Sequence, residues 1–166
     1  MDAPALYAHA IAIEREAVQR YTEFSWRMTD AGNDAAGEVF GTLARLEAKH
    51  LDALLKRTRA MQLPALAPHQ YAWLDAGAPE TAARELVFRL MTPRQALAIA
   101  LGAEKRAQVF FEHVLMTADD SALRALAQEM AMEEQEHVRL IEDWIRRTPP
   151  PTEDWAFDPD PPASGD

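Results

Sequence analysis

The sequence predicts an all-α protein, a single four-helix bundle made of two antiparallel helical hairpins joined by a long crossover. Apolar residues recur at the spacing of a helix rather than alternating as in a strand. In addition, 48% of the 166 residues are hydrophobic and only 6 are glycine, and this length allows one domain with a self-sufficient core. We expect the bundle to span residues 1–148 and a proline-rich acidic tail to span residues 149–166.

The first hairpin is bounded by capping and breaking residues. Asp2 is a good N-cap for a first helix that should end at Gly32. The second helix should begin at Asn33 or Asp34 and continue to about Met61. So few residues separate these helices that they must be antiparallel neighbours.

The segment 62–92 is too long for a hairpin turn and contains three prolines. A connection of this length can cross the bundle and start the third helix parallel to the second. We expect one short helix within it, near residues 79–88.

The second hairpin begins with a capping-box sequence at Thr92. This start predicts a third helix over residues 93–117. The fourth helix should begin at Asp120 or Ser121 and end before Pro149.

A Glu-x-x-His motif in the second helix is the first candidate for chemistry. Glu47 and His50 lie three residues apart and share a helix face with Phe40, Leu43 and Leu54. Burying a carboxylate and an imidazole is costly unless a partner neutralises them, and a divalent metal can do so. A single such motif also fits a solvated helix face.

A second copy of the motif favours the metal. Glu134 and His137 occupy the matching seam of the fourth helix, 87 residues after Glu47 and His50. The first and third helices each carry one acid on an apolar seam, Glu14 and, 90 residues later, Glu104. These six residues in this order are the ligand set of di-iron and di-manganese carboxylate bundles.

Six ligands suit two metals, because two divalent ions offset four carboxylates while the histidines bind as neutral groups. Oxygen-rich ligands with one imidazole per metal favour iron or manganese, although zinc can occupy the same positions. Other acids and histidines are expected to be solvated because they lie off the seams or in a loop: His9, Glu16, Glu23, His69 and His113.

The four expected helices resemble the rubrerythrin-like branch of the ferritin-like superfamily. The segments that carry the resemblance are IEREAVQRY, FGTLARLEAKHLDAL, ALAIALGAEKRAQVFFEHV and LAQEMAMEEQEHVRLI. It implies a di-iron bundle with the six residues as ligands and with Glu47 and Glu134 bridging the metals. Tyr21 could then bond a ligand carboxylate or pass an electron, and packing in the core is its alternative role.

Three departures from the rubrerythrin pattern affect the expected activity. The chain contains no cysteine, so it lacks a rubredoxin domain, and the resemblance then implies an external electron donor. The acid expected one turn after the third-helix ligand is Ala107, and the second tyrosine is Phe111.

The resemblance favours an oxidoreductase that delivers electrons from two metals to peroxide or dioxygen. Oxidation of ferrous iron for storage, a non-enzymatic metal site and hydroxylation of an organic substrate are the alternatives. The net charge of -10 argues against nucleic acid or an anionic membrane as a partner. We expect a cytoplasmic homodimer, because the sequence has no leader or membrane span and the tail replaces the helix on which ferritin cages depend.

Overall fold

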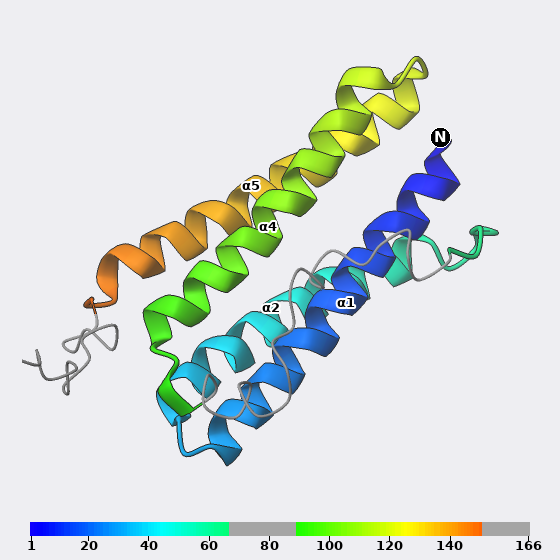
Figure 1. The fold of residues 1–166 in the computed structure, drawn as a ribbon. Helices are drawn as coiled ribbons and strands as arrows, with labels where there is room; N and C mark the ends of the chain where they lie inside the picture. The colour runs from blue at the N-terminus through cyan, green and yellow to red at the C-terminus, as the bar shows by residue number, and fades with distance from the viewer. Residues whose placement is uncertain (67–88, 151–166) are drawn as a thin grey trace, which may run out of the picture.

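The computed structural model describes residues 1–66 and 89–150, which form four long helices and no strand (Figure 1). The helices are α1 (Ala3–Asp30), α2 (Asp34–Arg57), α4 (Pro93–Thr117) and α5 (Ser121–Arg147). The predicted all-α bundle is therefore confirmed. The short helix expected near residues 79–88, and the tail from residue 151 onward, lie outside the described residues.

The helices begin where the capping residues predict. At the start of α4, the Thr92 hydroxyl accepts from the Gln95 backbone N–H at 3.2 Å, while the Gln95 side chain accepts from the Thr92 backbone at 2.8 Å. This reciprocal pair satisfies two donors that a helix start otherwise leaves open. The other three N-caps also accept from the backbone of the first turn: Asp2, Asn33 and Asp120.

The turn between α1 and α2 depends on Gly32, which adopts a left-handed φ of 78°. This conformation lets the Asn33 N–H reach the Met28 carbonyl at 2.8 Å and the Gly32 N–H reach the Thr29 carbonyl at 2.9 Å. These two bonds satisfy the last carbonyls of α1 and direct the chain back along it.

The predicted end of α2 near Met61 is wrong by four residues, because the helix stops at Arg57. The Thr58 hydroxyl and backbone N–H both bond the Leu54 carbonyl, at 2.8 Å and 3.0 Å. The Met61 N–H then turns back to the Thr58 carbonyl at 2.8 Å. The backbone bonds of Arg59 and Met61 thus reach back three residues instead of four, so the helix ends in a tighter turn.

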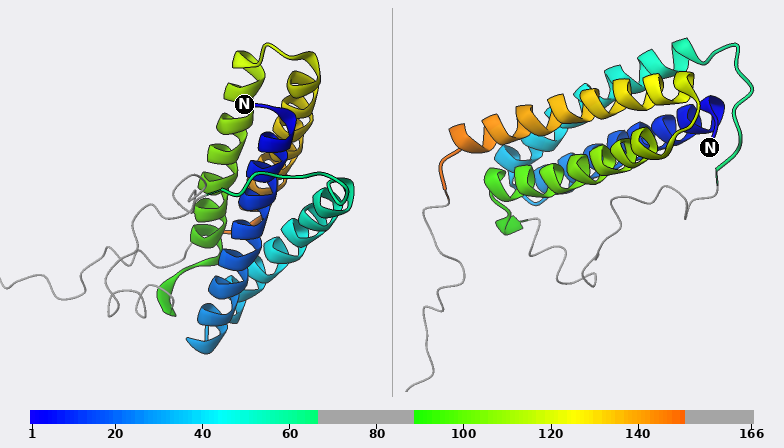
Figure 2. Two further views of the ribbon diagram at one scale, coloured as in Figure 1. Left: turned by 90° about the vertical axis from the view of Figure 1, so that its right-hand side faces the viewer. Right: turned by 90° about the horizontal axis from the view of Figure 1, so that it is seen from above.

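Between the two hairpins, side chains of α1 contact those of α4 and side chains of α2 contact those of α5. The backbones approach most closely between α2 and α4 and between α1 and α5 (Figure 2). The Asn33 side chain donates to the Met91 carbonyl, so α4 starts beside the turn where α2 starts. Helices α2 and α4 consequently run in the same direction (Figure 1). The end of α2 and the start of α4 therefore lie at opposite ends of the bundle, which is the arrangement that the predicted crossover requires.

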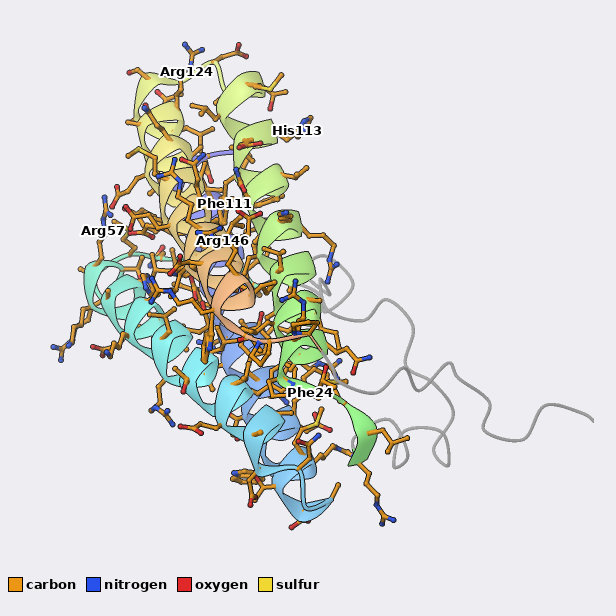
Figure 3. All side chains as sticks on the ribbon, turned by 90° about the vertical axis from the view of Figure 1, so that its left-hand side faces the viewer. Phe24, Arg57, Phe111, His113, Arg124 and Arg146 are labelled. Carbon is orange, nitrogen blue, oxygen red and sulfur yellow. The ribbon has the colours of Figure 1, made fainter. Side chains whose placement is uncertain are left out.

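The apolar core consists of two clusters, one toward each end of the bundle. One contains Leu6, Phe111 and Leu123, and the other contains Tyr21, Phe40 and Leu97. Figure 3 labels Phe111 in the first cluster and Phe24, which packs against the second. The face predicted for the second helix, which holds Phe40, Leu43, Glu47 and Leu54, is buried, and His50 at its edge is partly exposed.

Within the described ranges, no helix carries an apolar stretch long enough to cross a membrane.

Candidate metal centre

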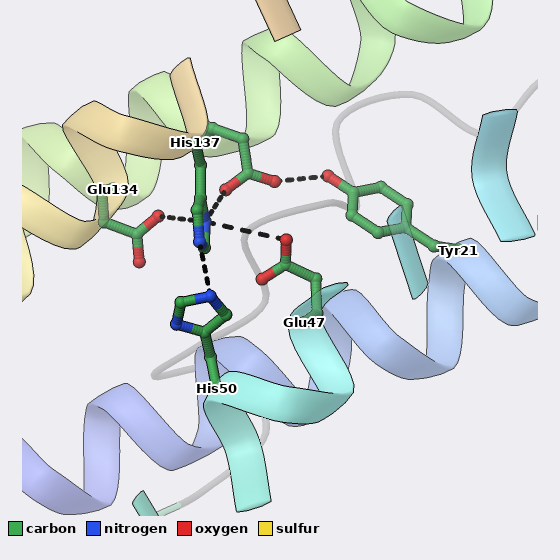
Figure 4. Close-up of polar contacts among 6 residues, drawn as sticks. Tyr21, Glu47, His50, Glu134 and His137 are labelled. Atoms are coloured by element: carbon green, nitrogen blue, oxygen red, sulfur yellow. Dashed lines mark hydrogen bonds and ion pairs between the residues drawn. The ribbon is translucent and has the colours of Figure 1, made fainter. Parts of the chain in front are cut away.

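Five of the six predicted ligands are buried in the middle of the bundle, between the two apolar clusters. These residues come from the inward face of each helix. Each of them is at most 5% exposed: Glu14, Glu47, Glu104, Glu134 and His137. His50 is only partly buried. Figure 4 shows the side chains of α2 and α5 turned toward one another, with Tyr21 approaching from α1.

The His137 ring joins three of the carboxylates. Its Nδ1 atom lies 3.3 Å from Glu104 Oε2, 3.6 Å from Glu47 Oε1 and 3.7 Å from Glu134 Oε2 (Figure 4). The ligand atoms of Glu47, Glu104 and His137 all lie within 4.8 Å of one another. Nδ1 is therefore the nitrogen that a metal held by these carboxylates would meet.

His50 contacts this group of side chains through the His137 ring. The two Nε2 atoms are 3.2 Å apart, and the rings stand edge to face with centroids 4.5 Å apart. Burial and then the charge of His137 lower the pKa of His50, so we assign His50 as the neutral acceptor of this contact.

The pKa values of the two histidines are shifted in opposite directions. Burial alone would lower the pKa of His137, but the hydrogen bond with Glu104 and the charges of Glu47, Glu104 and Glu134 raise it to about 9. A protonated His137 donates from Nδ1 to Glu104, so the carboxylates here favour a positive charge at this position.

The pKa values of the neighbouring carboxylates are raised as well. Burial, followed by the charge of Glu104, raises the pKa of Glu47 to about 7. Burial and the neighbouring acids raise the pKa values of Glu14 and Glu134 well above the usual range. Acids packed so closely in a dry interior can all be ionised only when cations balance them.

Tyr21 bonds a predicted ligand across the bundle. Its hydroxyl donates to Glu104 Oε1 at 2.7 Å, which leaves the other oxygen of this carboxylate facing His137 (Figure 4). The ring stacks on Phe40 with centroids 5.9 Å apart. Burial raises the pKa of Tyr21 well above its usual value, so the hydroxyl stays a donor.

Glu14 carries an unsatisfied acceptor. It shares a hydrogen bond with Glu47, yet its Oε2 atom is buried and has no hydrogen-bond partner among the described residues. A buried carboxylate oxygen without a donor is costly, and a cation would relieve that cost. The donor set, its raised pKa values and this orphan atom all fit a divalent metal.

A cavity of about 20 Å³ borders the carboxylates on the side of α1 and α4. Its volume suits a molecule of a few atoms. Neither histidine lines it, and the small side chains of Ala17, Ala103 and Ala107 border it. The remaining lining residues are Ile13, Glu14, Glu16, Tyr21, Glu47, Glu104 and Glu134.

His9 and Glu16, which were expected to be solvated, lie against other side chains of the bundle instead. His9 packs on Phe110 with ring centroids 5.3 Å apart, and burial lowers its pKa. Glu16 lines the cavity beside the carboxylates. Helical periodicity predicts one inward face for each helix, whereas α1 also packs its flank against α4, so neither position was expected to be covered.

A signal for this flank was present in the sequence. Ile13 is an apolar residue off the predicted seam, and it is buried beside Glu16 at helical spacing. Glu23 pairs with Arg27 at 2.7 Å, and His113 is exposed. His69 lies outside the described residues.

Comparisons with known proteins agree with this architecture. The profile of the ferritin-like domain family matches residues 5–149. Among solved structures, an uncharacterized conserved protein from Magnetospirillum magnetotacticum MS-1 matches with 32% sequence identity and a TM-score of 0.75. The match covers 93% of this chain and 100% of that chain. The comparison with curated proteins produced no match.

Proposed function

Because this chain belongs to the ferritin-like domain family, we propose that it is a rubrerythrin-like dimetal carboxylate oxidoreductase that reduces peroxide or dioxygen. The proposed ligands of two iron ions are the six predicted residues: Glu14, Glu47, His50, Glu104, Glu134 and His137. Glu47 and Glu134 are proposed to bridge, and manganese or zinc could be held by the same donors.

The cavity beside the carboxylates is the observation that carries this proposal. It borders Glu14, Glu47, Glu104 and Glu134 but neither histidine, so it gives access to the oxygen-ligand side of the centre. Its volume of about 20 Å³ suits a molecule of the size of peroxide or dioxygen. This size favours reduction of a small oxidant over hydroxylation of an organic molecule.

Bound iron would supply the electrons, two for each peroxide reduced to two waters. The protein's part is to position the ligands, exclude bulk water and hold protons. Tyr21 is proposed as a positioning residue, since its hydroxyl holds Glu104 at 2.7 Å. Without metal, Glu47, whose pKa is raised to about 7, is partly protonated at neutral pH, and it must release this proton to bind a metal.

The electrons must be replenished from outside the chain. No cysteine is present, so the chain cannot form a four-cysteine rubredoxin site, and we propose a separate redox protein as the donor. The homodimer and the cytoplasmic location remain predictions. Light scattering tests the first, and a particle of several hundred kilodaltons containing a mineral would favour iron storage instead.

The function is tested by loading the protein with ferrous iron without oxygen, measuring iron per chain and following oxidation by stopped-flow absorbance. We expect two irons per chain and oxidation by both peroxide and dioxygen, with only a weak preference for peroxide because Ala107 provides no ligating atom. Glu47→Ala should lose both metals because Glu47 bridges them. At most one iron per chain, or no reaction with either oxidant, would refute the proposal.

A further inference from the structure

Glu16 is an acid beside the proposed centre that none of the six ligand assignments uses. It lines the same small cavity as the four ligand carboxylates. Although the side chain is partly exposed, its Oε2 atom is enclosed by protein and has no hydrogen-bond partner in the described part of the chain. An acid on an ordinary solvated helix face would keep both oxygens in water.

The cavity holds a second oxygen of the same kind. Glu14, which is only 5% exposed, lines it and also has a buried Oε2 without a partner. Two neighbouring acids of α1 thus border one cavity, each with an unsatisfied acceptor. Carboxylate oxygens are the ligands that iron and manganese accept, so a cation bound in this cavity would meet an acceptor from each wall position of α1.

The opposite wall of the cavity cannot supply such a ligand. On α4, the residues beside Glu104 that line the cavity are Ala103 and Ala107, and neither carries a donor atom. Their small side chains leave room for a carboxylate that reaches across from α1.

We propose that Glu16 is a seventh ligand of the metal centre, a fifth carboxylate that binds from the cavity side next to Glu14. This inference rests on the proposed metal centre but not on the choice of oxidant. With five carboxylates facing two divalent ions, the centre carries one excess negative charge. That excess favours the more highly charged, oxidised metals.

The test is a titration of chelator-treated full-length protein with Co²⁺, whose visible absorbance reports the number of sites, their affinity and their coordination. Glu16→Gln removes the ligand charge and keeps the size of the side chain. Glu23→Gln is the matched control, since it makes the same change two turns along α1, where the carboxylate pairs with Arg27. Glu16→Asp keeps the charge but shortens the reach.

We expect Glu16→Gln to weaken one Co²⁺ site by roughly 10- to 100-fold, the range found even for outer-shell partners of metal ligands, and to change the visible spectrum. Glu16→Asp should weaken the same site, and Glu23→Gln should match the wild type. Adding Ala107→Glu to Glu16→Gln should restore affinity, because it returns a carboxylate to the cavity from the other wall.

Wild-type affinity and spectrum in Glu16→Gln would overturn the proposal. Equal weakening of Co²⁺ binding by Glu16→Gln and Glu23→Gln would also overturn it, because it would show a general charge effect. Slower Co²⁺ loading at unchanged affinity would overturn it as well. The proposed function can fail separately. A wild type that binds two metals through Glu16 but reacts with neither oxidant would refute the proposed function, while the assignment of Glu16 as a ligand would stand.

Discussion

At the scale of single residues, His137 shows how the centre is balanced. Three carboxylates surround its Nδ1 atom at 3.3 to 3.7 Å and raise its pKa to about 9. In protein stripped of metal by a chelator, the imidazolium then provides part of the positive charge that the carboxylates require. Metal binding must displace this proton, because a histidine ligand binds as the neutral imidazole.

The first prediction is a pH dependence of stability in the chelator-treated protein. The pKa of His137 is about 9 in the folded state and 6.5 in the unfolded reference, so the folded protein binds more protons between these values. Its free energy of unfolding should therefore fall as pH rises from about 6.5 to about 9. Urea titrations across this range measure it. His137→Gln should reduce this slope without abolishing it, because Glu14, Glu47 and Glu134 also have raised pKa values in the folded protein. A wild-type stability that rises with pH would contradict this prediction.

The second prediction concerns the Tyr21 hydroxyl. Tyr21→Phe leaves Glu104 Oε1 without its buried donor, which should cost about 1–3 kcal/mol of unfolding free energy in urea titrations. Two metals should still bind, because Tyr21 is not a ligand. Tyr7→Phe is the control on the same helix, where the ring contacts Arg57, and its effect should be smaller.

The same Tyr21→Phe variant separates the two roles predicted for this residue. Oxidation of the reduced centre at an unchanged rate would exclude electron transfer through the ring and leave positioning of Glu104. Unchanged stability would instead show that the hydrogen bond contributes nothing.

At the scale of helices, the contact between α1 and α2 depends on Gly37. The Ser25 hydroxyl donates to the Gly37 carbonyl at 2.8 Å. A Cβ added at Gly37 would lie 2.6 Å from Thr29 Oγ1 and 3.1 Å from the Ser25 carbonyl oxygen. The helices can approach this closely only because the residue has no side chain.

The third prediction compares two glycine-to-alanine changes. Alanine improves helix propensity at both positions by about 0.5–1 kcal/mol. Gly102→Ala should be stabilising, because its Cβ meets only the end of the Arg106 side chain at 3.5 Å. Gly37→Ala should be destabilising by about 1–3 kcal/mol, because it overpacks the contact with backbone. Thermal unfolding of both variants tests this, and stabilisation by Gly37→Ala would show that α1 and α2 separate readily.

At the scale of the whole molecule, the polar centre divides the apolar core in two. One cluster includes Leu6 and Phe111 and the other includes Phe40 and Leu97, while the buried acids of all four helices lie between them. Bound metal would join both hairpins at this layer and should stabilise the whole bundle rather than one helix.

The fourth prediction is a large metal-dependent stabilisation. A ligand that binds only the folded protein at about 100 times its dissociation constant adds about 2.7 kcal/mol per site. Thermal unfolding with and without Mn²⁺ should therefore shift to higher temperature in one cooperative transition. Glu47→Ala should show no shift, and a wild type that does not respond to metal would contradict a shared centre.

The sequence by itself determined the helices and their inward faces. Caps such as Asp2 and Thr92 act within one turn, and helical periodicity needs no information from other helices, so the helix starts and most buried positions followed from local rules. The repeated Glu-x-x-His motif placed Glu47, Glu134 and His137 on those faces in the same way. The missed end of α2 depended on backbone bonds at Arg59 and Met61 that reach back three residues instead of four, and the proline at position 64 did not predict them.

Only the tertiary structure decided which side chains meet. The bond from Tyr21 to Glu104 joins residues 83 apart, and the contact between His50 and His137 joins residues 87 apart. The place of Glu16 beside the carboxylates depends on how α1 is rotated against α4. A seam identifies the face that a helix buries, but the neighbour on each flank of that face is set by the packing of all four helices together.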